Sequence, residues 1–291
     1  MTELWQLLAG PFLEFGFMRR ALAGCLALAF GAAPVGAILM LRRMSLTGDA
    51  MAHAILPGAA VGYLVAGLSL PAMTVGGIVS GLVVAVAATL VARRGRQSED
   101  SSLAAFYLMS LALGVVIVST QGNNVDLLHV LFGSVLALDD DTLLLLGLIA
   151  TISLFSLALL YRPLVFECVD PNLLPRHSRW GGVAHFGFMG LLVINLVAGF
   201  HALGTLMAIG LMILPAASAR FWVQTFNRLL ALSVLLAFGG GAAGLLLSFH
   251  FEWPTGPTIV LVLGLVYCAS LLLAPAGLLR RQARSRRHYE S

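Results

Sequence analysis

The chain alternates long apolar runs with short charged segments. A helix that crosses the hydrocarbon core of a bilayer needs about 20 mostly apolar residues, so a run of that length between charges indicates a transmembrane helix. Nine runs qualify: Ala21–Leu41, Ala50–Leu70, Ala72–Ala92, Leu103–Thr120, Thr142–Tyr161, Gly181–Phe200, Ala202–Ala219, Leu229–Phe249 and Thr258–Leu279. The pattern therefore predicts an all-α polytopic membrane protein, a bundle of about eight or nine transmembrane helices.

Two of the nine runs are less regular than the others. The second contains His53 and Pro57-Gly58, and the seventh is short and contains Pro215. Membranes tolerate a broken or re-entrant helix where protein or a water-filled cavity covers the freed backbone. Either run fits an interruption of this kind, and a total of eight spans also fits the sequence.

The composition agrees with a membrane protein. Hydrophobic residues make up 59% of the chain and charged residues 10%, and the mean hydropathy is +0.96, whereas about 25% of residues are charged in a typical soluble domain. The three cysteines are isolated, which leaves no disulfide framework and no Cys-x-x-Cys metal site. We divide the chain into an N-terminal segment (1–20), one membrane domain (21–279) and a basic tail (280–291).

Every basic residue apart from the histidines is an arginine, and there is no lysine. If the nine runs alternate across the membrane with the N-terminus outside, all arginines except Arg19 and Arg20 lie on the cytoplasmic side. Arginine is enriched in cytoplasmic loops, so this orientation is the predicted one. The arginines thus report orientation, and we expect no nucleic-acid partner.

Asp49 and His53 carry the most informative chemistry in the sequence. An ionisable side chain at bilayer depth costs roughly 2.5 to 3.5 kcal/mol even on lenient scales, so such residues usually line a polar path. Residues four apart share one face of a helix, so Asp49 and His53 are predicted to present an oxygen and a nitrogen to the same point. A lone histidine is more often a satisfied core residue, but its acidic partner favours a half-set of ligands for Zn²⁺ or Mn²⁺.

The same alternation places acidic residues and histidines in the outer loops, among them His201, His250 and Glu252. One interpretation is that the outer loops are acidic simply because they lack arginine, and that the histidine rings lie in the headgroup region. The other is a cation-attracting outer mouth that makes transient metal contacts. These imidazoles favour zinc over manganese, and iron also fits a mixed nitrogen and oxygen site.

The connection from Arg162 to Arg179 is the longest predicted cytoplasmic loop between spans. It contains Phe166, Leu173 and Leu174, which a fully solvated linker does not need. The loop either packs on its own bundle or docks a cytoplasmic partner, and the composition alone supports both interpretations.

Three stretches in this order resemble the signature stretches of the zinc/manganese-type permeases of bacterial ABC importers, the metal-type ABC-3 family. They are residues 48–58 (GDAMAHAILPG), 208–217 (AIGLMILPAA) and 254–261 (PTGPTIVL), with a fourth, shorter match at 132–134 (FGS). The resemblance runs from about residue 20 to residue 280. It implies a multi-pass protein of the bacterial inner membrane with the ABC importer permease fold.

The resemblance also implies partners and site residues. A homodimer would receive the metal from an extracytoplasmic solute-binding protein and would be driven by a separate ATP-binding subunit in the cytoplasm. Asp49 and His53 match the residues that the family associates with metal in the translocation path. The loop before the sixth run matches the ATPase-coupling segment at Asp170-Pro171, but Leu173 and Leu174 follow where the family usually has a small-residue helix ending in glycine.

The residues themselves limit the mechanism. A P-loop needs a lysine, and this chain has none, so ATP hydrolysis of that type must belong to another subunit. His-Glu-x-x-His and Gly-x-Ser-x-Gly are also absent. Zn²⁺ or Mn²⁺ is therefore expected as transported substrate, with no permanently bound cofactor. A metal-coupled secondary transporter and an intramembrane enzyme that uses Asp49 and His53 as acid and base are the alternatives.

Overall fold

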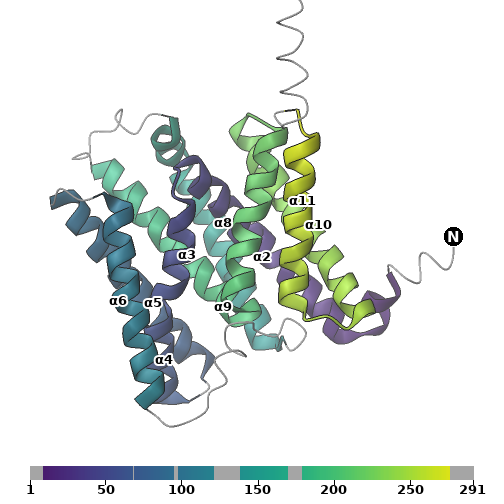
Figure 1. Ribbon diagram of the computed structural model, residues 1–291, viewed down its shortest axis with the longest axis horizontal. Coiled ribbons are helices and arrows are strands. Elements are labelled where there is room, and N and C mark those ends of the chain that lie inside the picture. The colour runs from purple at the N-terminus through teal and green to yellow at the C-terminus, as the bar shows by residue number, and fades with distance from the viewer. Residues whose placement is uncertain (1–8, 68, 95–97, 121–137, 170–178, 276–291) are drawn as a thin grey trace, which may run out of the picture.

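Long helices form the computed structural model (Figure 1), which describes residues 9–67, 69–94, 98–120, 138–169 and 179–275. Residues 9–14 form a short helix that precedes the bundle. The remaining helices are α2 (Gly16–Leu41), α3 (Ser45–Ala54), α4 (Leu56–Ala66), α5 (Leu70–Arg94), α6 (Glu99–Thr120), α8 (Asp140–Val169), α9 (Arg179–Trp222), α10 (Phe226–Phe251) and α11 (Thr255–Leu273). The prediction of an all-α polytopic fold is confirmed.

Eight stretches in the described part of the chain are long and apolar enough to cross a membrane. One of them, Ser45–Ala66, is α3 followed by α4. Another, Gly182–Trp222, lies in α9 and has 41 residues, about twice the length that one crossing needs.

Helix α9 is bent into two arms at Gly204. Gly204 has φ 77° and ψ 168°, a backbone conformation that glycine adopts readily because it has no Cβ. A Cβ built on Gly199 would lie 2.5 Å from the Cβ of Ala208, whereas nine residues of straight helix would separate them by about 13.5 Å. The two arms therefore run in opposite directions (Figure 1) and correspond to the sixth and seventh predicted runs.

The second run, one of the two irregular runs, is interrupted. Ile55 separates α3 from α4, and Pro57 lies in the first turn of α4. Proline has no N–H to donate, so Pro57 cannot make the helical hydrogen bond to His53. The seventh run behaves differently, because the helix continues through Pro215 to Trp222.

Close backbone contacts hold the bundle together. Helix α2 packs against α8, α9 and α10, and α4 packs against α5. A Cβ on Gly36 of α2 would lie 1.9 Å from the carbonyl oxygen of Met212 in α9, and a Cβ on Gly58 would lie 2.0 Å from the carbonyl oxygen of Gly76. Small residues let transmembrane helices approach this closely, and they bring α3 and α4 against the rest of the bundle.

The ends of several helices that carry arginine lie at the same edge of the bundle. Both ends of α9, the start of α10 and the end of α11 are at the upper edge in Figure 1, and the bend of α9 and the turn between α10 and α11 are at the lower edge. Arg179, Arg220 and Arg228 belong to the upper ends. We expect the upper edge to face the cytoplasm, because arginine is enriched there.

This orientation gives a direct topology prediction. Reporter fusions at Arg96, Arg179 and Arg284 are expected to report the cytoplasm, and fusions at Gly122 and Glu252 the outside, because arginine-rich loops are retained on the cytoplasmic side. Alkaline phosphatase and fluorescent-protein fusions at the five positions measure this. Opposite sides for Arg96 and Arg179 would contradict the alternation.

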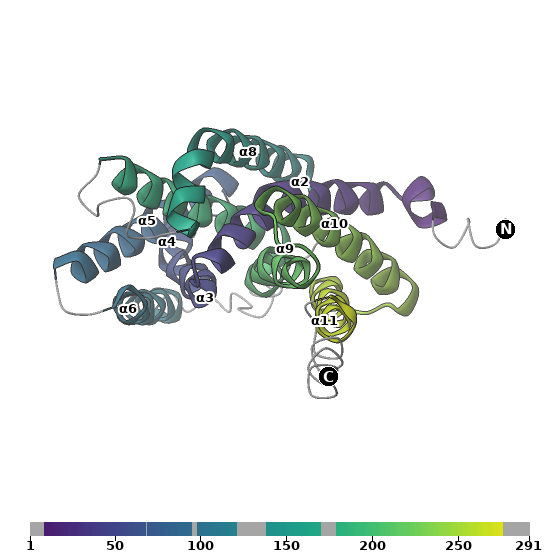
Figure 2. The same cartoon turned by 90° about the horizontal axis from the view of Figure 1, so that it is seen from above.

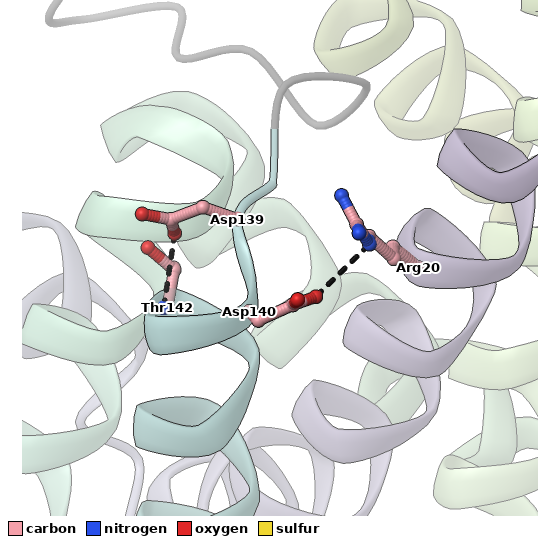
Figure 3. Close-up of polar contacts among 4 residues, drawn as sticks. All are labelled: Arg20, Asp139, Asp140 and Thr142. Atoms are coloured by element: carbon pink, nitrogen blue, oxygen red, sulfur yellow. Dashed lines mark hydrogen bonds and ion pairs between the residues drawn. The ribbon is translucent and has the colours of Figure 1, made fainter.

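Arg20, one of the two arginines expected outside, forms an ion pair. Its Nε lies 3.0 Å from Oδ1 of Asp140 at the start of α8, and this contact links α2 to α8 (Figure 3). The neighbouring Asp139 accepts a hydrogen bond of 3.0 Å from the backbone N–H of Thr142 (Figure 3). Hydrogen bonding from the side chain and backbone of Thr142 lowers the pKa of Asp139 below its ordinary value. The pairing of Arg20 with a carboxylate accounts for one exception to the arginine asymmetry.

Candidate functional site

Asp49 and His53 lie on the same face of α3, as the spacing predicts. His53 Nε2 is 3.9 Å from Asp49 Oδ1, which is too long for a hydrogen bond. Metal ligands of these types bind at about 2.0 to 2.2 Å, so one ion between the two atoms can reach both. The side chains are 60% (Asp49) and 30% (His53) exposed, so the site is accessible from outside the chain.

The two nitrogens of His53 have different surroundings. The ring stacks against Tyr107 of α6, with centroids 6.4 Å apart and an angle of 29° between the planes. Nδ1 is buried and has no hydrogen-bond partner among the described residues. Nε2 faces Asp49. Nε2 is therefore the nitrogen available to a ligand.

The break after α3 adds to the electrostatics of this site. His53 is in the last turn of α3, and the helix ends at Ala54. The carboxyl end of a helix carries the negative end of its dipole, and broken membrane helices use such ends to attract cations. The break therefore favours a cation next to His53.

The face of α3 that carries the pair is exposed at Asp49 and partly covered by α6 at His53. Leu46, one turn before Asp49, is 79% exposed. Helices α6, α3, α9 and α11 lie along one side of the bundle (Figure 2). A carboxylate facing lipid hydrocarbon would be costly. We therefore expect the face of α3 around Asp49 to border a water-filled path or another protein surface.

The described part of the chain supplies only a partial ligand set. No group of three or more His, Cys, Asp or Glu side chains in it lies close enough together to hold a metal ion. A metal bound at Asp49 and His53 would need further ligands from water, backbone carbonyls or a second copy of the chain.

The outer residues singled out from the sequence are placed separately. His201 lies in α9 just before the bend, and its Nε2 is buried without a hydrogen-bond partner in the described residues. His250 is exposed near the end of α10, with Nδ1 2.8 Å from the carbonyl oxygen of Leu246. Glu252 follows α10 with a left-handed backbone (φ 54°) and is exposed. Their predicted metal contacts stay predictions.

The residues expected to couple the ATPase, Asp170, Pro171, Leu173 and Leu174, lie outside the described residues. The flanking helices are described: α8 ends at Val169 and α9 begins at Arg179. The guanidinium of Arg42, after α2, lies 4.7 Å from the ring centroid of Phe188 in the first arm of α9. This contact links α2 to the first arm of α9.

Three residues near the site were not singled out from the sequence. Tyr107 contacts the ring of His53, and the hydroxyls of Ser80 and Ser110 bind the carbonyl oxygen of Ala54. Each lies in an apolar run without a charged neighbour one turn away. No local sequence signal distinguishes them, because only the packing of α5 and α6 brings them to α3.

The helices define a polytopic membrane protein with a broken span that carries a polar pair. The chain matches the model of the ABC 3 transport family over residues 14–274, and it belongs to this family. It is a multi-pass permease subunit of a bacterial ABC importer, located in the plasma membrane, and it is not an enzyme. The family membership confirms the resemblance and excludes the intramembrane enzyme.

Individual relatives agree with the family match. The chain is 30% identical to the manganese import system permease protein ScaB of Streptococcus parasanguinis over 263 residues, which cover 90% of this chain and 92% of that protein. It is also 30% identical to the chelated iron transport system membrane protein YfeD of Yersinia pestis over 276 residues, covering 94% and 90%. Among solved structures, it is similar to PsaBC from Streptococcus pneumoniae in complex with Fab, with a TM-score of 0.83, 26% identity and coverage of 98% of this chain and 100% of that chain.

Proposed function

We propose that this permease imports a divalent transition metal, and that Asp49 and His53 are its metal ligands. The observation that carries the proposal is the placement of Asp49 Oδ1 and His53 Nε2, 3.9 Å apart on an open face beside a helix break. A carboxylate oxygen and an imidazole nitrogen suit a borderline divalent cation. Two ligands from one chain hold an ion weakly enough to release it, which a transport site requires.

Manganese is the metal that we favour. The imidazoles expected at the outer mouth favoured zinc, but His201 and His250 belong to no metal-binding group in the described part of the chain. Relatives at about 30% identity are named for manganese and iron. Manganese also accepts more oxygen ligands than zinc does, so water could complete its shell around Asp49 and His53.

A second copy of the chain is the proposed source of further ligands. Asp49 and Leu46 are exposed on α3, so this face is open to a partner. A two-fold axis next to α3 would repeat both groups and bring two carboxylates and two imidazoles to one site. In the alternative arrangement, each chain has its own metal site, and water or backbone carbonyls supply the remaining ligands.

Energy and substrate would come from two other proteins. The chain has no lysine and so no P-loop. We propose that a cytoplasmic ATP-binding subunit docks on the loop that contains Asp170, Pro171, Leu173 and Leu174. An extracytoplasmic solute-binding protein would deliver the metal to the opposite edge, where α10 and α11 meet.

The test is metal uptake by cells that lack this chain and then regain it, with the ATP-binding subunit and the binding protein supplied. Restored uptake of Mn²⁺ is expected, and it should stop when the ATP-binding subunit is inactivated. Uptake of Mn²⁺, Zn²⁺ and Fe²⁺ is measured separately by elemental analysis. Zinc uptake without manganese uptake would overturn the choice of metal, and uptake with an inactive ATPase would indicate secondary transport.

A further inference from the structure

The break in the second span is held by two hydroxyls from neighbouring helices. Ser80 of α5 donates a hydrogen bond of 2.6 Å to the carbonyl oxygen of Ala54, and Ser110 of α6 donates one of 3.0 Å to the same atom. Ala54 is fully buried and directly follows His53. The last carbonyl oxygens of a helix have no N–H donor within the helix, and burial away from water makes an unpaired carbonyl costly. The two serines satisfy this carbonyl.

Helix α6 contacts the break at three points on one face. Tyr107 stacks on the ring of His53, and Ser110 binds the carbonyl of Ala54. A Cβ on Gly114 would lie 3.2 Å from the backbone nitrogen of Pro57. Spacings of three and seven residues keep these positions on the same side of a helix. The α6 face therefore follows the second span across its break, from His53 to Pro57.

Helix α5 contacts the other side of the break at backbone distance. A Cβ on Gly76 would lie 2.1 Å from the carbonyl oxygen of Gly58, and a Cβ on Gly81 would lie 3.0 Å from Cγ2 of Ile55. The missing side chains let α5 come close enough for the short hydroxyl of Ser80 to reach Ala54. The break is thus held between α5 and α6.

We propose that Ser80 and Ser110 are positioning residues of the metal site. They hold the carbonyl end of α3 in place and thereby fix the imidazole of His53 relative to the carboxylate of Asp49. Neither hydroxyl is proposed as a metal ligand, because both are used on Ala54. A shift of about 1 Å in a ligand is enough to weaken a site. This inference rests on the proposed metal-binding role of Asp49 and His53.

The test compares two replacements of Ser110, by Thr and by Val, that have the same shape as each other. Thr keeps the hydroxyl and Val replaces it with a methyl group, so any effect of added volume is common to both. Ser110→Val is expected to raise the KM of Mn²⁺ uptake roughly tenfold relative to Ser110→Thr, the size of effect typical for residues that orient metal ligands. The maximal rate per molecule in the membrane should change little. General structural damage would instead lower the maximal rate and leave KM unchanged.

Ser80→Ala tests the second hydroxyl with a change that only removes an oxygen atom. Its expected result is the same rise in KM, with a larger rise in Ser80→Ala combined with Ser110→Val. Ser233→Ala is the control, because Ser233 is buried as Ser110 is but donates to Leu229 of its own helix α10. It is expected to leave KM unchanged. If the Ser110 variants fail to reach the membrane, the comparison of Ser80→Ala with Ser233→Ala carries the test.

Equal KM values for Ser110→Val and Ser110→Thr, or a wild-type KM for Ser80→Ala, would overturn the positioning role. Asp49→Ala separates this outcome from failure of the proposed function. If Asp49→Ala abolishes uptake and the serine variants behave as wild type, only the positioning role is wrong. If Asp49→Ala transports normally, the metal site itself is wrong.

Discussion

Replacing Asp49 with alanine is expected to abolish metal uptake while the protein still inserts into the membrane. The change removes the carboxylate, one of the two proposed metal ligands that α3 presents side by side. Removing a charge from bilayer depth does not hinder insertion, because the charge itself costs roughly 2.5 to 3.5 kcal/mol there. His53→Ala is expected to have the same effect. Uptake rates are normalised to the amount of permease in isolated membranes.

Asp100→Ala is the matched control for this experiment. Asp100 is an exposed carboxylate in the first turn of α6, away from α3's polar pair in sequence, and no metal role is assigned to it. Its replacement should leave uptake and membrane insertion unchanged. If Asp49→Ala inserts normally and carries metal at the wild-type rate, the pair is structural and the proposed function is wrong.

Replacing Leu173 and Leu174 together with aspartate is expected to release the ATP-binding subunit and so stop uptake. Apolar side chains that become desolvated at an interface supply most of its binding energy, commonly about 2 to 4 kcal/mol for each anchor. Two carboxylates in their place would remove this contribution and would have to be desolvated themselves. Co-purification of the ATP-binding subunit with tagged permease measures the effect, and membrane insertion should be unchanged.

Asn172→Asp is the control for the loop, since it adds a negative charge beside the two leucines but removes no apolar side chain. The ATP-binding subunit should still co-purify with this variant. Undiminished co-purification with the double aspartate variant would show that the loop packs on its own bundle, the other interpretation that its composition allows.

The local pattern of the sequence was sufficient for the class of protein and for the segmentation of its helices. Apolar runs between charges predicted a polytopic bundle, and eight candidate spans are present in the described part of the chain. Hydrophobic length is a property of each segment alone, so it can be recognised without knowing the neighbours. The same reasoning applies to Asp49 and His53, because a spacing of four places two residues on one helix face in any context.

The sequence indicated less about the exact turns between segments and about the contacts between distant helices. Alternation of the sixth and seventh runs predicted a reversal near His201, but it did not identify the residue that makes it: Gly204, the third residue of the seventh run, was no signal in a chain with 31 glycines. The pairing of Arg20 with Asp140 was equally hidden, since the two residues are far apart in sequence and meet only because α2 packs against α8.

The sequence by itself thus determined the membrane class, the helical runs and the polar pair on α3. The tertiary structure decided how that pair is held: Ser80 and Ser110 come from two other helices and meet at the carbonyl of Ala54. It also decided that no third ligand residue joins the pair within the described part of the chain. The physical reason is that helix formation and hydrophobic length depend on near neighbours, whereas ligand sets and hydrogen bonds between helices depend on how segments distant in sequence pack.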